Sequence, residues 1–125
     1  MNESIGYAPP GWPDRVRPPG APDWELTATE FLLDCCPADY RGYRLLRRHP
    51  VVLARFAAVF TEAQERACRE GLAGVRVSLV DVVEPQVVAG AVNVWSQQQA
   101  VLTRLHREVD LVEAALRGRR FVPRL

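Results

Sequence analysis

Two prolines constrain the fold of this chain more than any other feature. Pro50 and Pro85 each stand at the start of a long segment in which apolar residues recur every three or four positions, the spacing of one face of an α-helix. Proline suits the first helical position, because the N–H that it lacks would have no partner there, and it ends a helix that arrives from its N-terminal side. The pattern predicts two long helices, and Gly118 marks the end of the second.

The segment after Pro85 has the clearer pattern. If it is helical as far as Gly118, it contains about 33 residues and is roughly 50 Å long at ~1.5 Å per residue. Its predicted buried stripe consists of Val88, Val92, Trp95, Leu102, Leu105, Val109, Val112 and Leu116.

The segment after Pro50 is predicted to be helical at least to Glu70. Its predicted buried face consists of Leu53, Phe56, Phe60, Ala63 and Ala67, widened by Val52 and Val59. Beyond Gly71 and Gly74, apolar and polar residues alternate from residue 75 to 79, which would suit a strand. However, the helical spacing also continues, and a strand without a partner leaves its backbone groups unpaired. We therefore prefer a helix, with room for a bend at the two glycines.

Residues 1–22 contain six of the ten prolines and are predicted to form an extended arm, because proline fixes φ and removes backbone donors. Trp12 and Val16 favour a docked arm over residues 11–23, whereas 1–8 are expected to be free. A first helix is predicted over 24–36, ended by Pro37, with either Asp23 as its cap or a capping box from Thr27 to Glu30.

Together these elements predict an all-α fold: a long antiparallel helical hairpin joined near Val83, plus a shorter N-terminal helix, making a three-helix bundle. The predicted organisation is an extended Pro-rich arm (1–22), a helical bundle domain (23–118) and a basic C-terminal tail (119–125). One short helix cannot cover both long ones, so part of the second long helix should stay exposed. The residues expected there, as an interface for a second copy or a partner helix, are Val87, Ala91, Val94 and Val101.

The most function-like stretch combines arginines with aromatic side chains just before Pro50. Such clusters can contact phosphates and stack on bases. A simpler interpretation is a solvated connection whose arginines pair with Asp34 and Asp39, and the net charge of only +1 favours it. The candidate contacts are Tyr40, Arg41, Tyr43, Arg44, Arg47 and Arg48, with Arg119 and Arg120 in the basic Arg117–Arg120 tail.

No residue pattern predicts catalysis, a cofactor or a metal site. Cys35 and Cys36 are adjacent, whereas thiol redox and metal motifs separate their cysteines so that both sulfurs can converge. There is no glycine-rich phosphate loop. Free thiols, no signal-peptide pattern and no apolar run of the ~20 residues that span a bilayer predict a cytoplasmic protein without a membrane partner.

Five stretches of the chain carry a resemblance to known proteins: Gly11-Trp-Pro13, Pro18-Pro-Gly-Ala-Pro-Asp-Trp-Glu25, Pro37-Ala-Asp-Tyr40, Leu46-Arg-Arg-His-Pro-Val-Val-Leu-Ala-Arg55 and Ala115-Leu-Arg-Gly-Arg-Arg-Phe-Val-Pro-Arg-Leu125. Together they resemble a group of small actinobacterial proteins of unknown function. The resemblance implies a source and a compartment, and it carries no activity or ligand. The sequence therefore predicts a non-catalytic protein–protein interaction or regulatory module that self-associates through helix faces, with accessory nucleic-acid binding as the alternative.

Overall fold

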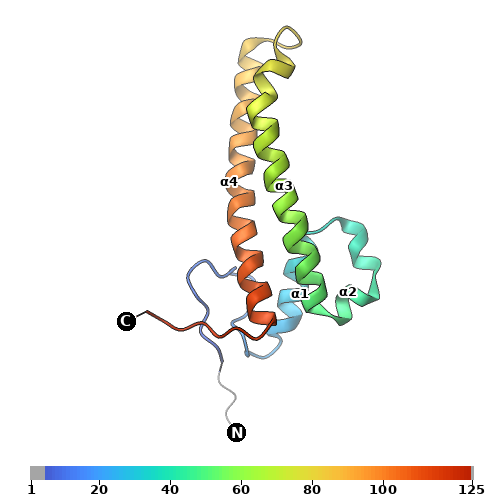
Figure 1. The fold of residues 1–125 in the computed structure, drawn as a ribbon, viewed down its shortest axis with the longest axis vertical. Coiled ribbons are helices and arrows are strands. Elements are labelled where there is room, and N and C mark those ends of the chain that lie inside the picture. Colours follow the sequence, from blue (N-terminus) through green and yellow to red (C-terminus); the bar gives the residue numbers. More distant parts are fainter. Residues whose placement is uncertain (1–4, 125) are drawn as a thin grey trace.

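The computed structural model describes residues 5–124, and this part of the chain is all-α without strands (Figure 1). The elements are α1 (Trp24–Asp34), the 3₁₀ turn η1 (Ala38–Gly42), α2 (Arg44–Arg48), α3 (Pro50–Leu79) and α4 (Pro85–Leu116). The predicted all-α class and the two proline-led helices are confirmed.

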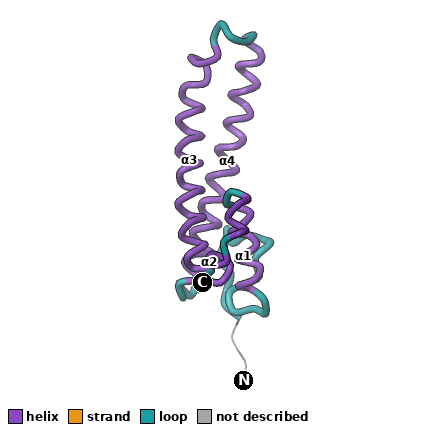
Figure 2. The backbone as a smooth tube through the Cα atoms, turned by 90° about the vertical axis from the view of Figure 1, so that its right-hand side faces the viewer, coloured by secondary structure: helices purple, strands orange, loops and turns teal. Residues whose placement is uncertain are grey.

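α3 and α4 form an antiparallel hairpin much longer than any other element (Figure 1). α3 continues through both glycines to Leu79, so the strand alternative after Gly74 is wrong. A short turn containing Asp81, whose φ is 66°, joins the two helices. α1, η1, α2 and the N-terminal arm gather at the opposite end, which we call the base (Figure 2). The rest of the hairpin, its distal half, has only two helices.

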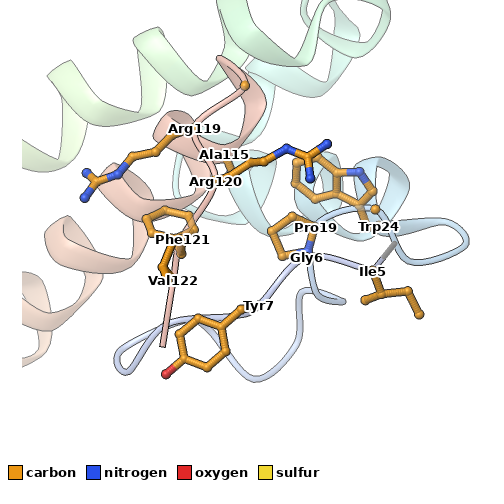
Figure 3. Close-up of a pocket in the computed structure, with 12 residues that line it drawn as sticks. Ile5, Gly6, Tyr7, Pro19, Trp24, Ala115, Arg119, Arg120, Phe121 and Val122 are labelled. Carbon is orange, nitrogen blue, oxygen red and sulfur yellow. The ribbon is translucent and has the colours of Figure 1, made fainter. Parts of the chain in front are cut away.

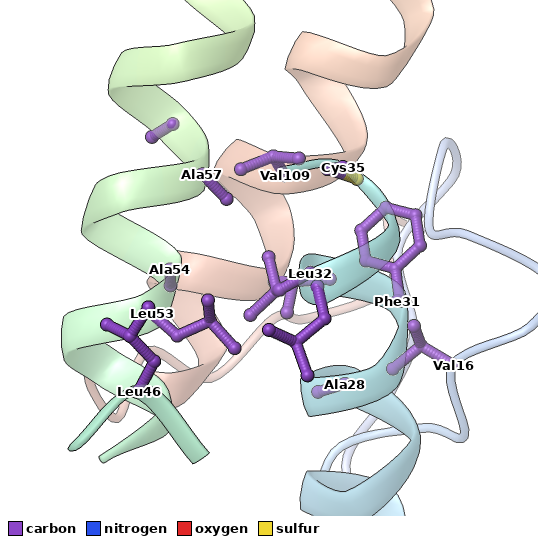
Figure 4. Close-up of a cluster of buried hydrophobic side chains, with 13 residues drawn as sticks. Val16, Ala28, Phe31, Leu32, Cys35, Leu46, Leu53, Ala54, Ala57 and Val109 are labelled. Atoms are coloured by element: carbon purple, nitrogen blue, oxygen red, sulfur yellow. The ribbon is translucent and has the colours of Figure 1, made fainter. Parts of the chain in front are cut away.

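The hydrophobic core lies at the base (Figure 4). Leu32 of α1 is fully buried among Leu53 of α3 and Val109 and Val112 of α4. Burying side chains of this size contributes about 1.5–3 kcal/mol each, so α1 is held by the same cluster that closes the hairpin.

The buried side of α3 differs from the predicted one. Leu53 is buried as predicted, but the other residues of α3 that face the core at the base are small: Ala54, Ala57, Ala58 and Thr61 are all at most 1% exposed. Phe56 and Val59, which were expected in the core, are 46% and 59% exposed, and Ala63 and Ala67 are exposed as well. Small side chains let two helix backbones approach closely, so the larger apolar residues lie on the neighbouring surfaces of the helix.

The N-terminal arm is docked over residues 11–23, as predicted. Pro13 and Val16 are buried, and the Trp12 indole N–H donates a hydrogen bond of 2.9 Å to the Val16 carbonyl. Residues 1–8 were expected to be free, and at Gly6 this prediction is wrong. The Gly6 N–H donates a hydrogen bond of 2.5 Å to the Pro19 carbonyl. Residues 1–4 lie outside the described part.

The first helix is shorter than predicted and begins without either predicted cap. Asp23 precedes it with φ 62° and makes no side-chain cap hydrogen bond. The Thr27 hydroxyl instead donates to the Trp24 carbonyl and accepts from the Arg17 backbone N–H. α1 ends at Asp34, two residues before the expected end. Across residues 5–124, none of the helices combines the length and apolar character needed to cross a bilayer.

The two glycines of α3 have different environments. A Cβ on Gly71 would overlap ring atoms of Trp95 on α4, whereas a Cβ on Gly74 would meet nothing within 4 Å. Gly71 is therefore required for the indole to lie against α3, and Gly74 only adds flexibility to the unfolded chain.

We expect Gly71→Ala and Gly74→Ala to change stability in opposite directions. Gly71→Ala should destabilise the protein by about 1–3 kcal/mol, because the methyl group displaces Trp95. Gly74→Ala should stabilise it by about 0.5–1 kcal/mol, because alanine is the better helix former at an open position. Urea denaturation at equal protein concentrations measures both, and equal effects from the two substitutions would contradict this packing.

Candidate functional site

A groove runs between α3 and α4 in the distal half of the hairpin. It has a volume of about 570 Å³, and we call it the distal groove. Ala91 and Val94, two of the four predicted interface residues, line it, and Val94 is 62% exposed. Val87 and Val101 are also exposed on α4 but lie outside the groove lining. The complete lining consists of Gln64, Ala67, Cys68, Ala91, Val94, Trp95, Gln98 and Leu102.

The distal groove continues the surface on which α1 packs. At the base, Leu105, Val109 and Val112 of α4 belong to or pack against the cluster that contains α1. Toward the tip, the same three- and four-residue spacing leads through Leu102, Gln98 and Val94. α1 ends too early to cover these positions, so an apolar face that is buried at the base becomes open groove beyond it.

A second hollow has a volume of about 440 Å³ and lies between η1 and the first half of α3. We call it the base groove. Its aromatic wall includes Tyr40 of η1, whose ring stands 6.0 Å from that of Phe56 and 6.4 Å from that of Tyr43. The lining consists of Tyr40, Arg55, Phe56, Val59, Phe60 and Ala63. The helical spacing of apolar residues predicted Phe56 and Phe60 to lie in the core. The small-residue stripe of Ala54, Ala57, Ala58 and Thr61 was the signal that could have corrected this.

The predicted arginine cluster is divided by ion pairs with α1. Arg41 bonds to Asp34 and, at 3.3 Å, to Glu30. Arg47 reaches the other oxygen of Glu30 at 3.1 Å. Asp34 also binds Arg15 from the arm. The Arg15 hydrogen bond lowers the pKa of Asp34, despite partial burial, and Arg41 adds to the effect. Two of the four cluster arginines therefore attach η1 and α2 to α1.

The other two arginines of the cluster are more open. Arg44 and Arg48 are exposed, and within residues 5–124 neither has a carboxylate oxygen within 4.0 Å. Arg48 lines a shallow hollow beside the start of α1, with Glu25 and Leu26. The structure therefore does not gather the predicted contacts into one basic patch.

Arg119 and Arg120 lie in a separate hollow, between the arm and the C-terminal tail (Figure 3). Trp24, Phe121 and Tyr7 also line it, and the Arg119 guanidinium stands 4.9 Å from the centre of the Phe121 ring. This contact is a cation–π interaction within the tail. None of the arginines at positions 41, 44, 47 and 48 lines this hollow, so the tail arginines and the Arg41–Arg48 cluster lie apart.

A polar cluster joins α3 to α4 at the middle of the hairpin. Glu65 of α3 accepts a hydrogen bond of 2.6 Å from the Thr103 hydroxyl and lies 2.8 Å from Nδ1 of His106, both on α4. Nε2 of His106 lies 3.4 Å from Asp110. The hydrogen bonds from Thr103 and then His106 lower the pKa of Glu65 below its ordinary value of 4.5. Thr103 and His106 thus both bond to Glu65, which links α3 to α4.

The thiols are placed as structural groups. Cys35 and Cys68 are buried and Cys36 is half-buried. Burial raises the pKa of Cys35 to about 12 and that of Cys36 to about 11, so both are protonated at neutral pH and are poor nucleophiles. In residues 5–124, no set of three or more His, Cys, Asp and Glu side chains is arranged to hold a metal ion.

Comparisons of this chain with protein-family models, with curated proteins and with solved structures find no match. Its function is therefore inferred from its own residues.

We expect Glu65→Gln to lower the free energy of unfolding by about 1 kcal/mol at pH 7, because a neutral amide bonds Thr103 and His106 less strongly than a carboxylate. A lowered folded-state pKa stabilises the protein above the unfolded pKa, and this stabilisation is lost as the pH falls through the folded value. The difference between wild type and variant should therefore shrink from pH 7 to pH 3.

Urea titrations at the two pH values measure this difference. The matched control is Glu62→Gln, whose exposed pair with Arg66 should contribute less than about 0.5 kcal/mol. Equal losses in the two variants would show that the Glu65 cluster does not hold the hairpin together.

Proposed function

We propose that this protein is a non-catalytic protein–protein interaction module that self-associates through the distal half of its hairpin. The observation that carries the proposal is the distal groove, an open apolar surface that continues a face buried at the base. In a pair of helices, each helix buries only the face that contacts the other helix. Any other apolar face stays in water unless a partner covers it.

A second copy suits this surface. Two hairpins placed face to face form a four-helix bundle, a common way of burying such stripes. The rim of the groove contains glutamine amides at positions 64 and 98, which can hydrogen-bond across an interface without burying charge. Three free thiols fit a reducing, cytoplasmic setting.

A non-catalytic role is supported by where the reactive groups lie. Cys35 and Cys36 are held as thiols by burial. Cys68 lines the distal groove without a titratable neighbour in the lining, and its sulfur contacts the Trp95 carbonyl at 3.5 Å. His106 is engaged by the cluster that joins α3 to α4.

We expect Val94→Glu to raise the dissociation constant of the dimer at least tenfold, since it places a charge in the groove that a second copy would have to desolvate (roughly 1.4 kcal/mol or more). Sedimentation velocity over micromolar concentrations measures this constant. Val122→Glu is the matched control, because Val122 is 79% exposed on the tail and should leave association unchanged. A wild-type monomer at ~100 μM, or equal association of wild type and Val94→Glu, would overturn the proposal.

Accessory nucleic-acid binding is the second candidate. It is favoured by the exposure of Arg44 and Arg48 beside Tyr43, which is 58% exposed, and weakened by the ion pairs of Arg41 and Arg47. Fluorescence anisotropy with a labelled oligonucleotide tests it. Binding that falls steeply with salt and disappears in Arg44→Ala/Arg47→Ala/Arg48→Ala would support this candidate. Identical curves for wild type and the triple variant would remove it.

A further inference from the structure

We propose that two copies associate antiparallel, so that the tip of each hairpin docks on the base groove of the other. The tip is defined as residues 77–84. This inference rests on the proposed self-association and adds its orientation, its register and the charges that select them.

The tip is apolar and acidic. Its four exposed valines are Val77, Val80, Val82 and Val83, from 37% to 79% exposed. Its carboxylates, Asp81 and Glu84, are exposed, and within residues 5–124 no basic group lies within 4.0 Å of either. Valines without cover and carboxylates without cations suit an aromatic surface with a basic rim.

The base groove has that chemistry. Phe56 and Val59, both large and exposed, form its apolar floor together with Tyr40. Arg55 lines it and is half-exposed while touching Glu113 at 3.5 Å. Arg44 directly follows Tyr43, whose ring packs on Tyr40. Of the four arginines in residues 38–48, Arg41 and Arg47 pair with carboxylates of α1 and Arg48 lines another hollow. Arg44 and Arg55 are therefore the cations that make the rim of the base groove basic.

The spacing along α3 allows one two-fold axis to cover both the distal groove and the base groove. Ala67 in the distal groove is twelve residues from Arg55 and twelve from Leu79, which is about 18 Å in each direction along a helix. An axis at Ala67 therefore pairs the two distal grooves and places each tip at the level of the partner's base groove. The contact would be about 36 Å long and about 20 Å wide, close to the ~800 Å² per partner of a stable interface.

A parallel arrangement of the two copies would not place the acidic tip of one copy on the basic rim of the other copy's base groove. It would bring Asp81 and Glu84 of one copy against the same residues of the other, and like charges in a forming interface oppose association. It would also leave both base grooves uncovered. The charge asymmetry between tip and base thus selects the antiparallel arrangement.

Charge exchange tests the contact. The tip variant is Asp81→Asn/Glu84→Lys, with asparagine at 81 because it tolerates the φ of 66° found there. The base variant is Arg44→Glu. Each should raise the dimer dissociation constant at least tenfold, and the chain that combines all three substitutions should return to within about threefold of wild type. Arg48→Glu is the control, because Arg48 lies on the same helix but lines a different hollow, and it should leave the constant unchanged.

A distance between the two tips tests the orientation independently. A spin label at Val82→Cys, in a chain with Cys35→Ala, Cys36→Ser and Cys68→Ala, should give a separation of about 40 Å between the two labels of an antiparallel dimer and less than ~20 Å in a parallel one. Circular dichroism confirms that each variant is folded.

The outcomes separate the two proposals. If the wild type is a monomer, both self-association and its orientation are overturned. If a dimer forms that ignores the tip and base charges, or whose tip labels lie close together, only the antiparallel arrangement is overturned. Rescue by the combined variant together with the long separation supports it.

Discussion

The close approach of α3 and α4 is the contact on which the rest of the structure depends. Small buried residues of α3, from Ala54 to Thr61, face the core at the base, and Gly71 admits the Trp95 ring further along. Because this seam is made of small side chains, the large apolar residues of α3 lie on either side of it. Leu53 meets α1, whereas Phe56 and Val59 face solvent. The exposed grooves are thus a direct consequence of how the hairpin closes.

The length of α1 decides how much of the hairpin is covered. It ends at Asp34, and Pro37 then turns the chain into η1, which brings Tyr40 against Phe56. Every apolar position of α3 and α4 beyond that level lacks a third helix. The covered base supplies the hydrophobic core, and the distal half keeps apolar positions that α1 leaves exposed.

The sequence predicted the helices well and their faces less well. Pro50, Pro85 and Gly118 mark helix ends through local backbone chemistry, which needs no tertiary information. The buried side of α3 was misassigned because hydrophobicity ranks phenylalanine above alanine, whereas close helix packing can favour the smaller residue. Asp34 was anticipated as an arginine partner, but the pairing of Glu65 with His106 spans 41 positions and depends on the relative register of α3 and α4, which no local pattern encodes.

The arginines have two roles that follow from their neighbours. Those that face α1 are neutralised and fix the base, and this reduces the field available to attract a nucleic acid. Those that face outward leave the base basic while the tip is acidic. Apolar burial is non-directional, so the grooves alone would let two hairpins pair in either orientation and at several registers. In the proposed dimer, charges of opposite sign at the two ends would remove that freedom, since only one orientation brings them together. On this chain, apolar surface would supply the affinity and the uneven distribution of charge would supply the geometry.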